Sequence, residues 1–251
     1  MKISISKKQT IKLLSVVTML LLWKVAALYF KSGLILPHPE DAILSGLKIV
    51  TAADFIKVAG VTILRGLIGF IISFILGVGI GILAGIYPNF NAFITPMLVT
   101  IRSVPVISLI LLALIWFNSG TVPVFIALLT MFPFICTNVT EGVKSVDPNL
   151  VVMAKLYRAG WKKIICGLYI PAISPFIISG ASSAMGIGWR AIIIGEVLSQ
   201  PQFGIGTKMQ TAQIFLNVDA LIAWTLIAVL LSFGFEKIIR MAEDHFIKWR
   251  S

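Results

Sequence analysis

Charged residues are scarce in this chain of 251 residues. Asp, Glu, Lys and Arg together make up 12% of the sequence, and hydrophobic residues make up 58%. Soluble domains carry about 25% charged residues. The composition is therefore typical of a protein that crosses a membrane several times.

Cysteine, histidine and phosphate-binding loops are scarce or absent too. Cys136 and Cys166 have neither the spacing of a metal motif nor that of a disulfide framework. His38 and His245 lie in polar segments, so a membrane-embedded Ser-His or His-metal site would lack its second member. The sequence has no GxxxxGK[ST] loop for ATP. We therefore expect no enzyme, no metal site and no cofactor in this chain.

Acidic residues are outnumbered, with 10 Asp and Glu against 21 Lys and Arg and a net charge of +11. In a soluble protein this excess would indicate nucleic-acid binding. Here the basic residues cluster at the ends of apolar runs, where they orient a membrane protein. They leave no solvated basic face to follow a phosphate backbone, and we expect no nucleic-acid partner.

Six apolar runs are long enough to cross a bilayer, which predicts an all-α polytopic membrane protein with about six transmembrane helices. They lie near residues 11–30, 62–86, 94–117, 121–139, 173–197 and 219–239. The chain thus divides into a cytoplasmic end with the first span (1–33), an extracytoplasmic amphipathic segment (34–61), a core (62–240) with a polar loop (140–171), and a cytoplasmic tail (241–251).

The basic residues predict which segments face the cytoplasm. Thirteen of the 21 fall at the two ends of the chain and in the polar loop, and the loops on the other side hold fewer. Both termini and the polar loop are therefore expected inside. The thirteen are Lys2, Lys7, Lys8, Lys12, Lys144, Lys155, Arg158, Lys162, Lys163, Lys237, Arg240, Lys248 and Arg250.

Small residues favour close helix packing in two of the spans. The second span has a small residue at every fourth position, which forms one ridge along a helix. The fifth span mixes glycine with hydroxyl residues, and either close packing or the lining of a polar path explains it. The ridge consists of Gly69, Ser73, Gly77, Gly81 and Gly85. The fifth-span group includes Ser179, Gly180, Ser182, Ser183, Gly186 and Gly188.

Three of the charged residues inside spans are expected to be the most costly, because a central Arg costs about 2.5–3.5 kcal/mol and such groups face a bundle interior. They are Arg102, Arg190 and Glu196. Arg190 and Glu196 are six residues apart, too far round one helix to pair. Each Arg either attracts an anionic solute or ties helices together. Arg65, near the start of its span, is expected to extend to the interface. The candidate solute-path residues are Arg102, Ser182, Ser183, Arg190 and Glu196.

Two prolines interrupt the spans, Pro105 in the third and Pro133 in the fourth. A proline removes a backbone hydrogen bond and usually kinks a helix. We expect plain kinks at both.

The polar loop carries a recognisable pattern. Met153-Ala154-Lys155 leads through Gly160 to Ile170-Pro171. This resembles the cytoplasmic motif of the membrane-spanning permease subunits of bacterial ATP-binding-cassette importers, most closely the nitrate/sulfonate/taurine type. That motif has a Glu-Ala-Ala start, a Gly and an apolar-Leu-Pro ending. Here an apolar residue replaces the Glu, and Arg158 stands where the Gly is expected.

Other segments resemble the same family in the same order along residues 34–240. They are Leu36-Pro37-His38-Pro39, Thr62-Ile63-Leu64-Arg65, Ile101-Arg102-Ser103-Val104-Pro105, Trp116-Phe117, Gly195-Glu196 and Gly204-Ile205-Gly206.

The resemblance implies a type I importer permease in a bacterial cytoplasmic membrane. The loop 140–171 would dock on a separate ATPase subunit that holds the ATP, with Ala154 and Ala159 allowing close approach and cations meeting acidic groups. Six spans would form half of a pore, completed by a second copy or a paralogue, and an extracytoplasmic solute-binding protein would deliver the solute. The docking residues would be Met153, Ala154, Lys155, Arg158, Ala159, Gly160 and Pro171.

Several alternatives remain open from the residues. The solute is expected to be a sulfonate, nitrate or taurine, and a neutral or cationic nutrient such as a vitamin precursor is also compatible. A secondary transporter or channel would need acidic residues near the middle of broken spans, and Glu196 is the one acid near a span core. A membrane scaffold protein would leave the polar loop without a transport role.

Overall fold

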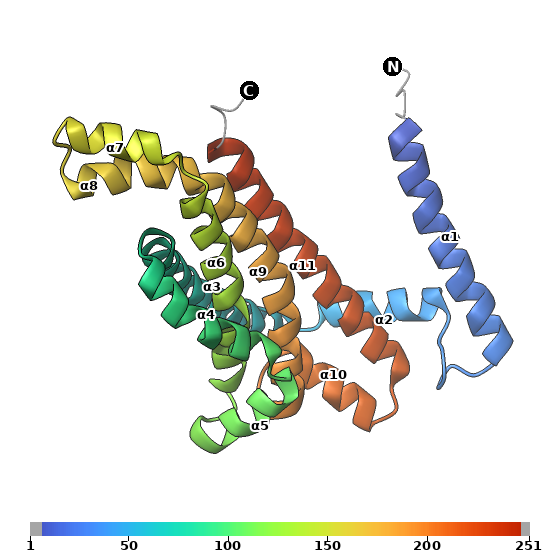
Figure 1. Ribbon diagram of the computed structural model, residues 1–251. Helices are drawn as coiled ribbons and strands as arrows, with labels where there is room; N and C mark the ends of the chain where they lie inside the picture. The colour runs from blue at the N-terminus through green and yellow to red at the C-terminus, as the bar shows by residue number, and fades with distance from the viewer. Residues whose placement is uncertain (1–6, 247–251) are drawn as a thin grey trace. The chain divides into compact units, whose positions relative to one another are not determined.

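The computed structural model describes residues 7–246, and the predicted cytoplasmic residues Lys2, Lys248 and Arg250 lie outside this range. Within it the chain is helical, with no β-strand. It forms two compact units (Figure 1). One contains the chain up to Lys57 together with residues 208–229, and the other contains residues 58–207 and the chain from Leu230 on.

The first unit contains α1 (Lys7–Phe30) and α2 (Pro39–Thr51). Helix α2 is the helix expected within residues 34–61. Pro39 begins it and Glu40 and Asp41 lie in its first turn, where negative charge favours a helix N-terminus. Further along, Asp54 forms an ion pair of 2.7 Å with Lys208, and this contact holds the pKa of Asp54 below its usual value.

The second unit is built around α6 (Val122–Lys144) and α9 (Ile170–Ser199), which run side by side (Figure 1). Buried apolar side chains of both helices form its core, with partly buried side chains of α3 (Phe55–Ile86) packed against them. Its buried residues include Met131, Ile135, Ile173, Trp189 and Ile192. The end of α11 (Val218–Phe246) also contacts this core, where the Phe235 ring lies 5.2 Å from that of Trp189.

The small-residue ridge of α3 packs against α6, which confirms the packing interpretation. A Cβ atom on Gly77 would lie 2.8 Å from Ile135 Cβ, and one on Gly81 would lie 2.8 Å from the carbonyl oxygen of Cys136. Ser73 is buried in the same ridge and donates to the Gly69 carbonyl at 2.7 Å. The backbones of α3 and α6 thus approach as closely as glycine allows.

The third span is broken rather than kinked. Helix α4 (Pro88–Ser103) and helix α5 (Val106–Trp116) meet at an angle of 98°. Val104 is extended, with φ −70° and ψ 130°. A residue that precedes a proline disfavours the helical conformation. Helix α4 therefore ends at Ser103, before Val104, and α5 begins at Val106, after Pro105. Pro133, by contrast, lies inside α6, and that helix continues to Lys144.

The number of spans agrees with the expected fold class. Within residues 7–246, five helices are long and apolar enough to cross a membrane, and the bent α4–α5 pair makes a sixth if it counts as one span. The fifth predicted span begins earlier than expected, because a continuous helical stretch runs from Trp161 to Ser199.

Candidate functional site

The polar loop folds into a short helix with a defined end. Helix α7 (Pro148–Leu156) begins at Asp147, whose carboxylate accepts a hydrogen bond of 2.9 Å from the Asn149 N–H. At its other end the Ala159 N–H donates to the Ala154 carbonyl at 3.0 Å, and the Arg158 N–H donates to the Lys155 carbonyl at 2.9 Å. These two bonds are the pair that defines a Schellman motif.

The Schellman motif explains why a glycine is expected at position 158. The residue after the helix cap must adopt the left-handed conformation, and Arg158 does so with φ 54°. Glycine has no Cβ penalty there, so it is the usual residue at this position. Arg158 therefore keeps the backbone geometry of the motif at some conformational cost.

The second half of α7 and the turn after it present large apolar side chains to solvent. Leu156 is 78% exposed and Tyr157 is 82% exposed. Val152, Met153 and Trp161 are exposed as well. We call these five residues the α7 tip. The exposed cations Lys155, Arg158, Lys162 and Lys163 lie in the same segment.

The two alanines that are expected to allow close approach of a partner are only partly exposed. Ala154 and Ala159 are partly buried and pack against the unit's own hydrophobic core. In a Schellman motif the residue after the turn contacts the last helical turn, and small side chains suit that contact. Gly160 is exposed and precedes α8 (Trp161–Ile164), and a Cβ there would meet nothing within 4 Å.

A π-helical turn joins α8 to the fifth span. It covers Ile165–Tyr169, where the Ile170 N–H bonds to the Ile165 carbonyl, five residues back. Pro171 follows at the start of α9 and has no N–H for the Gly167 carbonyl, and a proline ring also clashes with the carbonyl four residues earlier. Pro171 therefore accounts for the wider turn. Such π-turns are frequent at functional sites.

Helix α9 has a packed face and a polar exposed face. The packed face holds small residues such as Gly180, Ala184 and Gly188. The exposed face follows the helical period through Ser179, Ser183, Gly186, Arg190 and Ile194, and Ser182 beside it is partly buried. The packing interpretation thus holds for the buried face, and the lining of a polar path stays a prediction for the exposed face.

Among the residues that the structure describes, the two span arginines have no carboxylate partner. Arg102 is exposed and lies 5.1 Å from the centre of the Phe134 ring, a cation–π contact. Arg190 is exposed, and its side chain makes no hydrogen bond or ion pair with any residue in the range 7–246.

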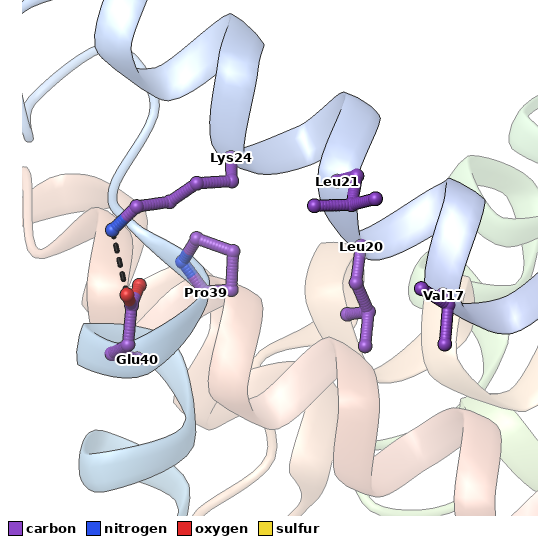
Figure 2. Close-up of a pocket in the computed structure, with 6 residues that line it drawn as sticks. All are labelled: Val17, Leu20, Leu21, Lys24, Pro39 and Glu40. Carbon is purple, nitrogen blue, oxygen red and sulfur yellow. Dashed lines mark hydrogen bonds and ion pairs between the residues drawn. The ribbon is translucent and has the colours of Figure 1, made fainter.

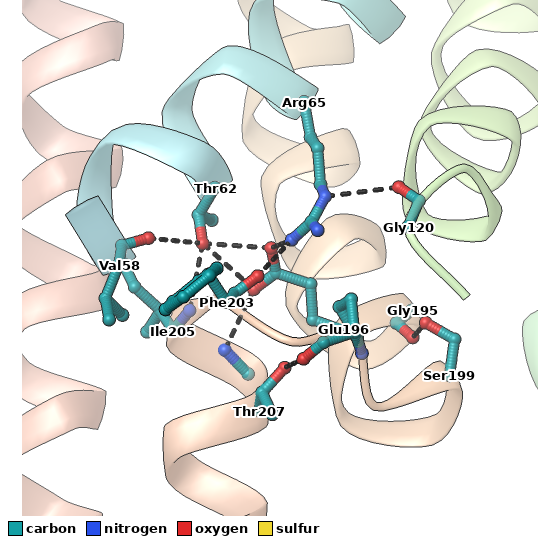
Figure 3. A network of polar contacts seen from close by, with 12 residues as sticks. Val58, Thr62, Arg65, Gly120, Gly195, Glu196, Ser199, Phe203, Ile205 and Thr207 are labelled. Carbon is teal, nitrogen blue, oxygen red and sulfur yellow. Dashed lines mark hydrogen bonds and ion pairs between the residues drawn. The ribbon is translucent and has the colours of Figure 1, made fainter. Parts of the chain in front are cut away.

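Glu196 is fully buried and pairs with Arg65 (Figure 3). Arg190 is not its partner, as the spacing of six on one helix predicts. Arg65 Nη1 donates to the Glu196 carboxylate at 2.5 Å, and the Thr62 hydroxyl donates at 2.9 Å. The Gly206 N–H donates to the other carboxylate oxygen at 2.9 Å. The Ile205 N–H in turn donates to Thr62 Oγ1 at 2.9 Å.

Arg65 also donates hydrogen bonds to two further segments of the chain. Arg65 Nη1 also donates to the Phe203 carbonyl at 2.7 Å, and Nε donates to the Gly120 carbonyl at 3.2 Å. The expectation that Arg65 extends to the interface is therefore wrong, since its side chain is 12% exposed and pairs inward. We call Thr62, Arg65, Glu196, Ile205 and Gly206 the clasp.

The glycines around Glu196 make room for its carboxylate. A Cβ on Gly204 would lie 2.6 Å from the Glu196 carboxyl carbon, and one on Gly206 would lie 2.7 Å from Glu196 Cβ. The sequence shows the Gly-x-Gly pattern, but it does not show that Thr62 and Arg65 contact Glu196 beside this pattern. Their spacing of three on one helix was the available signal, and it does not identify a partner 131 residues away.

The α7 tip and the clasp lie at opposite ends of α9. Helix α7 lies where α6 ends and α9 begins (Figure 1). The clasp residue Glu196 lies near the last residue of α9, a helix of 30 residues or about 45 Å. A bilayer core about 30 Å thick fits between the two.

Comparison with known proteins identifies a family. Residues 77–246 match the family described as binding-protein-dependent transport system inner membrane component. This range contains α7, α9 and Glu196, and Thr62 and Arg65 precede it.

Named relatives span most of the chain. A relative from Bacillus subtilis, whose name assigns it to aliphatic sulfonates transport, is 27% identical over 233 residues, 92% of this chain and 84% of its own length. The taurine transport system permease protein of Escherichia coli is 24% identical over 233 residues, 90% of this chain and 84% of its own length. The bicarbonate transport system permease protein of Synechococcus elongatus is 30% identical over 139 residues, 55% of this chain and 50% of its own length.

Proposed function

This chain belongs to the family of inner membrane components of binding-protein-dependent transport systems, and we propose that it carries a small anion inward along α9. The family membership makes it a multi-pass permease subunit of an ABC importer for small solutes. The solute class, the path and the partners' contacts are the proposed parts.

The unpaired Arg190 is the observation that supports an anionic solute. An arginine facing lipid at the middle of a span would cost about 2.5–3.5 kcal/mol, so such a group faces protein or an aqueous path. Arg65 is already neutralised by Glu196, and Arg190 is not neutralised by any residue within 7–246. Two relatives are named for sulfonate and bicarbonate transport, and another is named for taurine. A sulfonate, nitrate or taurine therefore fits better than a cationic or neutral vitamin precursor.

The exposed face of α9 supports a path shared with a second subunit. Ser179, Ser183 and Arg190 lie in one stripe with the exposed Ile187 and Ile194, and lipid would solvate the charge of Arg190 poorly. A second copy or a paralogue placed against this stripe would enclose it. Within this proposal Ser182, Ser183, Arg190 and Arg102 lie along the path. Glu196 does not, because its carboxylate is buried and occupied by the clasp.

The α7 tip supports docking to a separate ATPase subunit that binds the ATP. Its large apolar side chains are exposed beside four cations. An apolar socket with acidic groups at its rim would complement both features. In this arrangement the tip and both chain termini lie in the cytoplasm, and the clasp lies at the outer face, where a solute-binding protein delivers the anion.

Uptake by the complete transporter in membrane vesicles tests the proposed solute class. The permease, with the ATPase and binding protein of its own system, should transport a solute that carries an anionic group, such as a sulfonate, taurine, nitrate or bicarbonate, when ATP is supplied. Arg190→Gln should lower uptake about tenfold or more, since a hydrogen bond to a charged group contributes about 1.5–3 kcal/mol. Arg190→Lys should retain part of it.

The control is Lys48→Gln, which removes an exposed charge from α2 and should leave uptake unchanged. Transport only of solutes that lack an anionic group, or full uptake by Arg190→Gln, would contradict the proposal. Uptake that an ionophore abolishes while ATP is present would indicate a secondary transporter and contradict the ATP-driven mechanism.

A further inference from the structure

The corner between α1 and α2 gathers polar groups at one level of the first span. The Trp23 indole N–H donates to the Pro37 carbonyl at 3.1 Å. Lys24 Nζ lies 2.6 Å from Glu40 Oε1 in the first turn of α2 (Figure 2). Tryptophan and lysine side chains are the usual anchors of a span at the headgroup level of a bilayer.

A shallow groove of about 260 Å³ opens below this ion pair. Its apolar wall comes from one face of α1, because residues spaced by three or four lie on the same side of a helix. Figure 2 shows Lys24 above this wall, with its side chain directed to Glu40. The residues lining the groove are Val17, Leu20, Leu21, Lys24, Pro39 and Glu40.

Both charges of the pair remain accessible. The Lys24 side chain is 36% exposed and that of Glu40 is 61% exposed. The hydrogen bond from Lys24 holds the pKa of Glu40 below its usual value, so the carboxylate is ionised at neutral pH. An ammonium group has three donors and a carboxylate has two acceptor oxygens, so each can bind a second group of opposite charge.

We propose that this corner binds a phospholipid with a primary ammonium headgroup, that is, a phosphatidylethanolamine. Its phosphate contacts the Lys24 ammonium, its own ammonium donates to the Glu40 carboxylate, and an acyl chain lies along Val17, Leu20 and Leu21. The structure of the lipid fixes the order of these three contacts, because its phosphate lies between the acyl chains and the amine. Lys24 follows the apolar wall on α1, and Glu40 is contributed by α2.

The neighbouring surface of α2 fits the same lipid layer. Ile43, Leu44 and Leu47 are exposed apolar side chains on this helix. A helix with an exposed apolar face that adjoins a span is suited to lie in the plane of the interface. The lipid would then occupy the corner where this helix meets α1, and it would fix the angle between the two.

Lipid titration of the purified full-length chain, read by native mass spectrometry, tests this proposal. Phosphatidylethanolamine should bind at one site about tenfold more tightly than phosphatidylglycerol, which has no amine, or phosphatidylcholine, whose quaternary ammonium has no N–H donor. Lys24→Gln and Glu40→Gln should each remove this preference. Lys48→Gln and Asp41→Asn, which change exposed charges on α2 outside the groove, should keep it.

The exchanged pair, Lys24→Glu with Glu40→Lys, separates lipid binding from helix packing. It retains an ion pair between α1 and α2 but places a carboxylate where the phosphate would lie. The exchanged variant should therefore melt like the wild type and lose the preference for phosphatidylethanolamine. If it kept the preference, or if the three lipids bound equally to the wild type, the corner would hold general boundary lipid and the proposal would be wrong.

Discussion

At the residue scale, glycine sets the distance between α3 and α6. Gly81 is buried, and a Cβ there would lie 2.8 Å from the Cys136 carbonyl oxygen, which cannot move without disturbing α6. Gly81→Ala should therefore lower the free energy of unfolding by about 1–3 kcal/mol. Gly79→Ala is the matched control on the same helix, because a Cβ there meets nothing within 4 Å. It should be neutral or stabilising by up to about 1 kcal/mol.

Unfolding of both variants in a denaturing-detergent titration measures this difference. Equal stability of Gly81→Ala and Gly79→Ala would show that α3 and α6 do not approach as closely as described.

The clasp should behave as a coupled unit. Removing one partner of a buried ion pair leaves the other charge uncompensated and costs about 3–5 kcal/mol. Arg65→Met and Glu196→Met should each destabilise the protein by this amount, and the double variant by less than the sum. The same detergent titration, run as a double-mutant cycle, measures the coupling.

The exposed pair of Lys208 and Asp54 is the comparison for the clasp, because both of its side chains are accessible to solvent. Its removal should change stability far less, since solvent screens surface pairs. Additive losses at Arg65 and Glu196 would show that the two residues act separately.

At the element scale, hydropathy predicted the apolar helices well and their breaks poorly. The run 94–117 is predominantly apolar, so its composition does not reveal the 98° break after Ser103. The break arises because Val104 is extended before Pro105. The early start of the fifth helical stretch at Trp161 was hidden by the charges of Lys162 and Lys163. Polarity alone placed these residues in a loop, although a helix can extend beyond the bilayer.

The candidate site was predictable only where it is local in sequence. The motif from Met153 to Pro171 and the polar face with Arg190 are patterns on single segments. The clasp joins residues 131 positions apart, and its partners follow from packing that periodicity does not reveal. The inward orientation of Ala154 also depends on the Schellman motif, which the sequence obscured because Arg158 replaces the usual glycine.

The π-turn between α8 and α9 is the element whose behaviour follows most directly from one residue. Pro171→Ala supplies an N–H that can reach the Gly167 carbonyl, so the turn should tighten toward an α-helix. Amides of residues 166–171 should then exchange with deuterium several-fold more slowly, since one added hydrogen bond contributes about 0.5–1.5 kcal/mol. Hydrogen–deuterium exchange with mass spectrometry measures this change.

Pro175→Ala is the control for this element, because Pro175 lies inside α9 beyond the π-turn. It should leave exchange at residues 166–169 unchanged. Unchanged exchange in Pro171→Ala would mean that another feature causes the π-turn.

At the scale of the whole molecule, α9 links the two ends of the second unit. One end is fixed by Glu196, whose carboxylate accepts hydrogen bonds from Thr62, Arg65 and Gly206. The other end begins at the π-turn beside the α7 tip. A displacement of the α7 tip would therefore be transmitted to α9 through the π-turn. It would tilt the helix about the end that Glu196 fixes. Arg190 lies about 9 Å along the axis from that fixed end, so it would be displaced less than Ser179.

This arrangement predicts that exposed and inward residues of α7 respond differently to substitution. Leu156 and Tyr157 contact solvent in the isolated chain, so Leu156→Asp should leave the melting temperature unchanged. It should reduce co-purification of the ATPase subunit by about tenfold or more, because burial of one such side chain contributes about 1.5–3 kcal/mol. Ala154→Asp should instead lower the melting temperature, since Ala154 packs against the core, and its effect on docking would be indirect. If Leu156→Asp retained both the ATPase and uptake, the apolar side chains of the tip would not be the docking surface. If Ala154→Asp kept the wild-type melting temperature and lost the ATPase, the partner would contact the alanine face instead.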